Sequence, residues 1–309
     1  MRRPQVLRVA RVVFVLATLA GAWWGFRGRW SEVGEALAGT GPLRLAGAVA
    51  LAALGLALTG CLWRMLLRGV GSDVGVSDAA AVFFVGQLGK YVPGSVWSVA
   101  AQAQLGRRHD VPARSSLAAS AVFLLVHTAT GLLLGGVLLA VSGPGRIPVA
   151  YAVLGAVVGC IALAPPLVRR LADRLAGRTT RFGVAELAAT MALMGLVWLL
   201  YGASSLLLVP AGPGTPGLVG TTAAFAVAHA VGVLVVLAPA GVGAREGVLV
   251  ALLAPALGVP GAAAVALLSR LVHALADFAV AGVAAGASRT ARRTGPDAEA
   301  PEPARAGGR

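Results

Sequence analysis

The chain has 309 residues, of which 58% are hydrophobic and only 12% are charged, and its formal net charge is +14. Soluble domains carry about 25% charged residues, so this composition excludes a chain made mainly of soluble domains. The positive charge does not indicate a nucleic-acid partner, because the basic residues form short clusters between long apolar runs.

Six apolar segments are long enough to cross a bilayer, since a membrane-spanning helix needs about 20 mainly apolar residues. In chain order, these segments are residues 6–26, 43–63, 116–141, 148–168, 185–209 and 261–285. The first has a basic flank like a signal peptide, but no clear cleavage site follows it, so we expect a retained span. The sequence therefore predicts an all-α integral membrane protein with about six transmembrane helices.

Two further apolar regions, residues 79–106 and 218–258, are interrupted near their middle by proline and glycine. These residue types stop a helix and let the chain turn. The residues that we expect to break the helices are Pro93, Gly94, Pro239, Gly241 and Gly243. We expect each region to enter and leave the membrane on one side as a re-entrant helical hairpin. The alternative is eight plain spans with kinks.

The chain contains an internal repeat at a shift of 146 residues. This shift aligns Pro93 with Pro239 and His127 with His273, and it also aligns the two interrupted regions with each other. The copies are predicted to span about residues 5–142 and 148–287, as one polytopic membrane domain over residues 1–287. Residues 288–309 are polar and proline-rich, so we expect a disordered cytoplasmic tail.

The basic clusters predict the orientation, because loops rich in Lys and Arg stay on the cytoplasmic side. Loops 64–78, 107–115 and 169–184 would all be cytoplasmic, together with both termini. With two re-entrant hairpins, the two copies then have opposite orientations, and inverted repeats with broken helices are typical of transporters. Abundant Arg, Ala and Gly favour a GC-rich bacterial gene, so we expect a bacterial cytoplasmic membrane.

Both interrupted regions also carry a recognisable signature. Residues 89–94 (Gly-Lys-Tyr-Val-Pro-Gly) resemble the first signature of a flippase-like membrane family that includes the transmembrane region of lysylphosphatidylglycerol synthase. Residues 239–247 are similar to its second signature. The resemblance implies a membrane domain that moves lipids, such as aminoacylated phosphatidylglycerol, between leaflets. The bifunctional synthases carry a soluble transfer domain after this region, whereas a short polar tail follows here, so we expect a stand-alone member.

Charged residues inside apolar segments are expensive, so they face a cavity, a partner or a ligand. Lys90 precedes the first break, and Arg245 and Glu246 follow the second. We expect these charges, with helix N-termini near Ser95 and Ala244, to bind a lipid phosphate. The candidates for contact with the lipid are Lys90, Tyr91, Ser95, Arg245, Glu246, Arg270, His273 and Asp277. The alternative is that Lys90 reaches the membrane interface and an Arg245–Glu246 pair only locks the hairpin.

Arg270, His273 and Asp277 are spaced i, i+3 and i+7, which places them on one face of the last span. They form either part of a functional site or a structural ion pair, of Asp277 with Arg270 or Arg245. The polar residues that we expect to line a cavity are Gln87, Gln102 and His127.

The sequence contains no phosphate-binding loop, metal-ligand motif or nucleophile elbow, so we expect no enzyme, metal or cofactor. The leading interpretation is a translocator of a phospholipid or lipid-linked precursor, with membrane lipids as its partners. A second is a non-transporting partner of a lipid-modifying enzyme or glycosyltransferase, which would dock on the basic residues 169–181. A third is an integral-membrane transferase that uses Lys90, Glu246 and Asp277 for acid–base chemistry.

Overall fold

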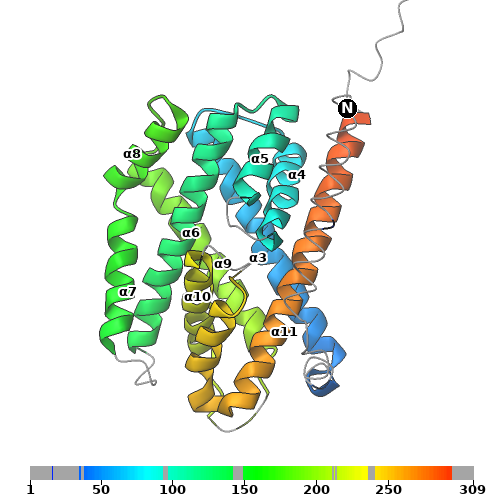
Figure 1. Cartoon of the computed structure of the whole chain (residues 1–309), viewed down its shortest axis with the longest axis vertical. Coiled ribbons are helices and arrows are strands. Elements are labelled where there is room, and N and C mark those ends of the chain that lie inside the picture. Colours follow the sequence, from blue (N-terminus) through cyan, green and yellow to red (C-terminus); the bar gives the residue numbers. More distant parts are fainter. Residues whose placement is uncertain are drawn as a thin grey trace, which may run out of the picture.

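The structure is a computed structural model that describes residues 38–92, 97–141, 149–210, 212, 214–235 and 241–293, together with the single residues Leu16 and Glu35. Over these residues the chain forms a bundle of helices without a strand (Figure 1). The helices are α3 (Pro42–Gly69), α4 (Val76–Gln87), η1 (Leu88–Tyr91), α5 (Trp97–Gly106), η2 (Arg107–His109), α6 (Ala113–Val141), α7 (Val149–Ala162), α8 (Pro165–Ala176), α9 (Val184–Leu206), α10 (Leu218–Leu234) and α11 (Ala244–Arg293).

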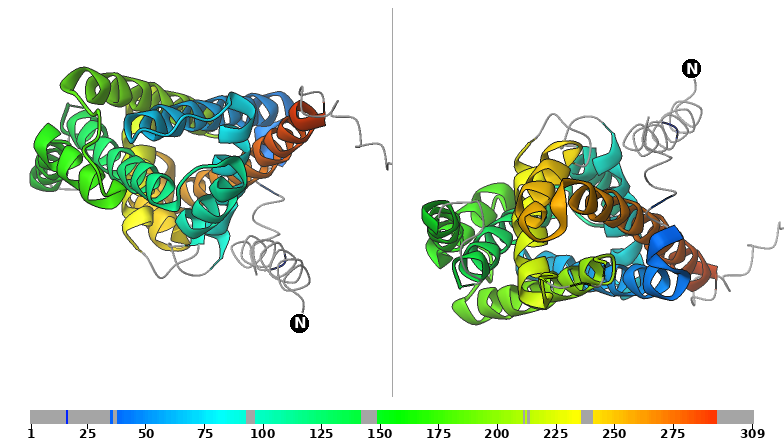
Figure 2. Two further views of the ribbon diagram at one scale, coloured as in Figure 1. Left: turned by 90° about the horizontal axis from the view of Figure 1, so that it is seen from above. Right: turned by 90° about the horizontal axis from the view of Figure 1, so that it is seen from below.

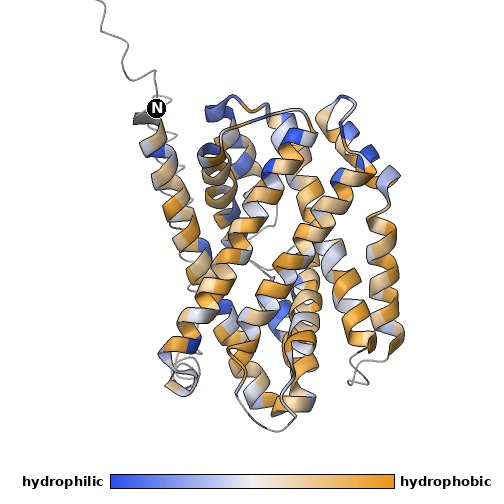
Figure 3. Cartoon of the chain, turned by 180° about the vertical axis from the view of Figure 1, so that it is seen from behind, coloured by the Kyte–Doolittle hydropathy of each residue, from blue (hydrophilic) through white to orange (hydrophobic). Residues whose placement is uncertain are grey.

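Four of the described helices, α3, α6, α9 and α11, are long and apolar enough to cross a membrane. They contain the predicted segments 43–63, 116–141 and 261–285 and nearly all of 185–209. Figure 3 shows apolar residues along their length, with hydrophilic residues gathered mainly toward one end of the bundle. The prediction of an all-α, multi-pass membrane protein is confirmed, while the predicted first span, 6–26, lies almost entirely outside the described residues.

The predicted span 148–168 is not one straight helix. It is divided into α7 and α8, whose axes are bent by 54°. Pro165 and Pro166 begin α8, and proline has no backbone N–H with which to continue a helix from the previous turn. Proline also forces the preceding residue out of the helical region, and Ala164 accordingly has a ψ of 126°. The boundary therefore follows from the two prolines.

Helix α11 is broken once, at Gly258, whose φ of 71° and ψ of 164° are not helical. The first part follows the interruption of the region 218–258, and the second part contains the last predicted span. This second part continues beyond the domain boundary expected at residue 287. Ser288 is buried and donates a hydrogen bond of 2.5 Å to Asp78 Oδ1, which anchors the end of the helix to the start of α4.

The first interrupted region, residues 79–106, forms α4, η1 and α5, and α4 packs against α5. At its ends, His109 Nδ1 lies 3.0 Å from Asp78 Oδ2, so the chain enters and leaves this region at one end of the molecule. The second region forms α10 and the first part of α11, which also pack together. Figure 1 shows α4 and α5 in one half of the bundle and α10 in the other.

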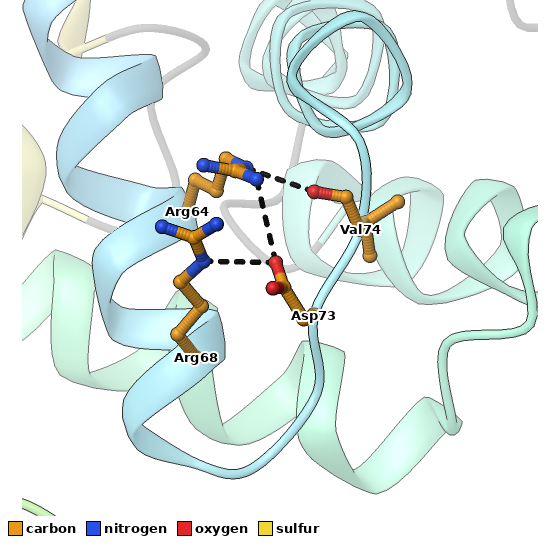
Figure 4. A network of polar contacts seen from close by, with 4 residues as sticks. All are labelled: Arg64, Arg68, Asp73 and Val74. Carbon is orange, nitrogen blue, oxygen red and sulfur yellow. Dashed lines mark hydrogen bonds and ion pairs between the residues drawn. The ribbon is translucent and has the colours of Figure 1, made fainter.

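The three basic loops meet at the same end of the bundle, where Asp73, Val111 and Arg178, one from each loop, line a common pocket. Arg181 N–H donates a hydrogen bond of 3.0 Å to Gly69 O, and the Arg178 guanidinium bonds Val70 O. Asp73 Oδ1 accepts a hydrogen bond of 2.8 Å from Arg68 Nε, and Arg64 contacts the same oxygen (Figure 4). The hydrogen bond from Arg68 lowers the pKa of Asp73. The predicted common location of these loops therefore agrees with the fold.

Close helix packing surrounds a central aromatic core that includes the fully buried Trp63, Trp198, Phe83 and Phe225. Glycine allows the closest approach: a Cβ added to Gly202 of α9 would lie 2.6 Å from Thr222 Cα of α10. Figure 2 shows α7 and α8 at one edge of the bundle and the last part of α11 at the opposite edge. The helices between these edges enclose the candidate site.

Candidate functional site

A cavity of about 160 Å³ lies where α3, the end of α4, η1, α6, α9, α10 and α11 meet. Both interrupted regions reach it: Lys90 and Tyr91 from the first, and Gly241 and Arg245 from the second. The neighbouring break residues Pro93, Gly94, Ser95 and Pro239 lie outside the described residues. The charged residues in the described lining are three cations and one carboxylate, namely Lys90, Arg245, Arg270 and Asp277. The cavity is therefore a positively charged chamber inside an apolar bundle.

The carboxylate of Asp277 joins α11 to η1. Its Oδ2 lies 2.6 Å from Lys90 Nζ and accepts a hydrogen bond of 2.7 Å from Tyr91 OH. The Tyr91 ring also stacks on Phe278, with 5.6 Å between the ring centroids. The side chain of Asp277 is 6% exposed and that of Lys90 is 33% exposed. Asp277 thus depends on two donors from the first interrupted region rather than on Arg270 or Arg245, the partners considered from the sequence.

Both carboxylate oxygens of Glu246 are bonded, one to a residue of α11 and one to the residue directly before this helix. Oε1 lies 2.6 Å from Arg270 Nη1, and Oε2 accepts a hydrogen bond of 2.7 Å from Gly243 N–H. A glutamate that bonds the backbone three residues earlier is a common N-terminal helix cap. The cap occupies the backbone N–H of Gly243, directly before the helix N-terminus at Ala244 where the sequence predicts a phosphate site. The ion pair also joins the two parts of α11 across the break at Gly258.

Arg245 is the buried cation whose charge is least compensated. It is 8% exposed, its Nη2 donates a hydrogen bond of 3.0 Å to Ser269 Oγ, and its guanidinium lies 4.9 Å from the centroid of the Phe225 ring. Among the described residues, no carboxylate lies within ion-pair distance of Arg245. A buried charge without an opposite charge is costly unless a ligand or a wet cavity stabilises it. Arg245 therefore favours an anion at the cavity wall.

Three histidines line the cavity: His127, His229 and His273. The rings of His127 and His229 are 5.0 Å apart between centroids, and His273 Nδ1 lies 2.8 Å from Ser269 O. The repeat offers no histidine equivalent to His229, so the sequence does not indicate that His229 lines the cavity. Its place in the lining follows from the packing of α10 against α6. Within the described ranges, no group of three or more His, Cys, Asp or Glu residues is arranged to hold a metal ion.

The two glutamines have different environments. Gln87 lines the cavity. Gln102 lies outside the lining, where it is buried and its Oε1 accepts a hydrogen bond from Ser120. Ser120 in turn accepts a hydrogen bond of 3.1 Å from Trp63 Nε1. Gln102 therefore connects α5 to α6 and α3 as part of the packed core.

Two of the predicted helix breaks can be located. Gly241 and Gly243 have φ values of 68° and 85°, in the left-handed region that favours glycine. The chain turns there, so that α11 begins at Ala244. Gly241 lies close against Gly232 of α10, which brings the turn to the cavity wall.

Long apolar helices around a charged interior cavity define a polytopic membrane protein whose polar site is enclosed by the bundle. The family model described as the lysylphosphatidylglycerol synthase TM region matches residues 8–281, and the chain belongs to this family. The resemblance inferred from the two signatures is thereby confirmed. No curated protein matches the chain.

Proposed function

We propose that this protein translocates a phosphate-bearing lipid, a phospholipid or a lipid-linked precursor, across a bacterial cytoplasmic membrane. The observation that carries this proposal is Arg245, a buried cation on the cavity wall without a carboxylate partner among the described residues. A phosphate group would supply the missing negative charge and accept charge-assisted hydrogen bonds from the guanidinium. Membership of a family of membrane regions from a lipid-modifying synthase supports a lipid as the ligand.

Two oppositely oriented copies would build the pathway, with α4–η1–α5 and α10 plus the start of α11 as re-entrant hairpins. The aligned glycines of the repeat support this. A Cβ on Gly86 would lie 3.1 Å from the backbone N of Gln102, and one on Gly232 would lie 2.9 Å from Arg245 Cβ. Each glycine thus allows the two arms of its own hairpin to approach closely. Inverted repeats with broken helices place their ligand near the middle of the bilayer.

The ion pairs give the cavity a way to respond to a ligand. In the structure, Lys90 binds Asp277 and Arg270 binds Glu246. A phosphate attracted by Arg245 competes with these carboxylates for the neighbouring cations. A ligand shifts a conformational equilibrium only by the difference in its affinity for the two states. Loosening of the Lys90–Asp277 pair would release the first hairpin from α11 and open the cavity toward one side of the membrane.

The basic end of the bundle would face the cytoplasm, together with both termini, because short loops rich in arginine are retained on that side.

The exposed arginines of α8 favour a second candidate function. Arg169, Arg170 and Arg174 are exposed on this short helix beside α7 and offer a basic surface to an enzyme partner. In that case the protein would recruit a lipid-modifying enzyme without moving lipid.

Reconstitution into liposomes tests the proposed function. Vesicles of phosphatidylglycerol and phosphatidylcholine would carry a fluorescent phosphatidylglycerol, and a membrane-impermeant reductant would quench the label in the outer leaflet only. We expect the parent protein to make nearly all of the label accessible to the reductant, whereas protein-free vesicles protect the inner leaflet. Protection equal to that of protein-free vesicles, for phosphatidylglycerol and for a polyprenyl-phosphate-linked sugar alike, would favour the recruiting function.

A further inference from the structure

The size of the cavity limits which part of a lipid it can hold. Its volume is about 160 Å³. Pockets that enclose a drug-sized molecule have volumes of about 300–1,000 Å³, so this cavity has room for a small polar group and none for two acyl chains. If the protein translocates lipid, as proposed above, the chains must remain outside the cavity while the headgroup is inside. The cavity then needs an apolar exit to the side of the bundle.

The exposure of the lining residues indicates where this exit lies. On the α9 and α11 walls, Tyr201 and Ala276 are buried. On the α6 wall, Leu124 lines the cavity and is 41% exposed, and Val235, directly after α10, lines it and is 39% exposed. Helices α6 and α10 pack against each other. The lining thus reaches the outer surface at two apolar side chains from neighbouring elements.

The outer face of α6 is apolar at the same place. Leu117 lies seven residues before Leu124, on the same face of the helix, and is also exposed. Exposed leucines on a membrane helix contact lipid chains, because the bilayer interior is as apolar as they are. An acyl chain that lies along this face of α6 would therefore meet the opening of the charged cavity at Leu124.

We infer that the acyl chains leave the cavity between α6 and the end of α10, across Leu124 and Val235. The phosphate lies on the inner side of this opening, at Arg245, and the chains stay in the bilayer. Leu124 is then a positioning residue for the lipid, and its size sets the width of the exit.

Substitutions at Leu124 test this inference in the liposome assay. Leu124→Trp should reduce the translocation of fluorescent phosphatidylglycerol to near the protein-free rate, because the indole would fill the exit. Leu124→Ala should raise the rate above that of the parent, because the smaller side chain widens the exit. The matched control is Leu199→Trp, since Leu199 is a similarly exposed leucine, at 43%, on α9 and outside the lining. This control should keep the parent rate, and thermal unfolding in detergent should be unchanged in all three variants.

The outcomes separate the inference from the proposed function. Parent-like translocation by Leu124→Trp would overturn the exit between α6 and α10 while leaving translocation intact. An equal loss in Leu124→Trp and Leu199→Trp would also overturn it, because the effect would not depend on the cavity. A parent protein that moves no lipid would overturn the proposed function itself, and the exit with it.

Discussion

Lys90 Nζ lies 2.6 Å from Asp277 Oδ2, but the two partners are not equally buried. The Asp277 side chain is almost fully enclosed, whereas a third of the Lys90 side chain is exposed. Removal of one partner from a buried ion pair costs about 3–5 kcal/mol, because the other charge is left unpaired. Since only Lys90 can reach a polar surrounding, we expect Lys90→Met to lower the unfolding temperature in detergent more than Asp277→Asn does.

The double variant Lys90→Met/Asp277→Asn removes both charges and provides the control. It should recover most of the stability lost in Lys90→Met, and it should still lack translocation. Equal unfolding temperatures for the two single variants would contradict the assignment of Asp277 as the buried member of the pair.

Glu246→Gln should impair lipid translocation, because a neutral amide cannot balance the charge of Arg270. Glu186→Gln is a matched control, since Glu186 Oε2 accepts a hydrogen bond of 3.0 Å from Gly183 N–H in the same capping arrangement at the start of α9. A glutamine amide oxygen can still accept the capping hydrogen bond, so neither variant should lose much stability from this source. Only Glu246→Gln should lose translocation. If both variants transport alike, Glu246 acts only as a cap.

The close approach of α9 and α10 predicts opposite effects for two glycines of the same helix. Gly202→Ala should destabilise the protein by about 1–3 kcal/mol, because the new methyl group has no room against Thr222. Gly195 has no atom within 4 Å of an added Cβ. Gly195→Ala should therefore stabilise the helix, by up to about 1 kcal/mol. Thermal unfolding of the two variants in detergent measures both effects, and a stabilising Gly202→Ala would show that the helices lie farther apart.

The proposed orientation predicts which loops react with a membrane-impermeant thiol reagent in cells. Cys61 and Cys160 are exposed on the outside of the bundle and would first be replaced by alanine. Thr179→Cys, in the basic loop between α8 and α9, should react only after the cells are permeabilised. Gly212→Cys, between α9 and α10, should react in intact cells. Reaction of Thr179→Cys in intact cells, with Gly212→Cys reacting only after permeabilisation, would contradict the proposed orientation.

The membrane-spanning helices could be predicted from the sequence, because length and hydropathy alone determine which segments fit a bilayer. The extents of α3, α6 and α9 therefore differ from the prediction by only a few residues at most ends. The bend between α7 and α8 was missed because residues 148–168 are apolar throughout, although Pro165 and Pro166 carried the local signal.

The grouping of the charges could be predicted only in part. The spacing of Arg270, His273 and Asp277 placed them on one helix face, and all three line the cavity. Their partners could not be predicted, because Lys90 approaches Asp277 only through the packing of helices that are far apart in the chain. His229 was missed for the same reason. Its distance from His127 depends on the contact between α6 and α10.

The central claim is that Arg245 holds an anionic headgroup, and a single variant tests it most directly. Arg245→Gln removes a buried charge without leaving a carboxylate unpaired, because Glu246 keeps Arg270 and Asp277 keeps Lys90, so we expect an unfolding temperature equal to or above that of the parent. Translocation of fluorescent phosphatidylglycerol by the same preparation should fall to the protein-free rate, and Arg245→Lys should retain part of it. Parent-like translocation by a stable Arg245→Gln variant would contradict the account.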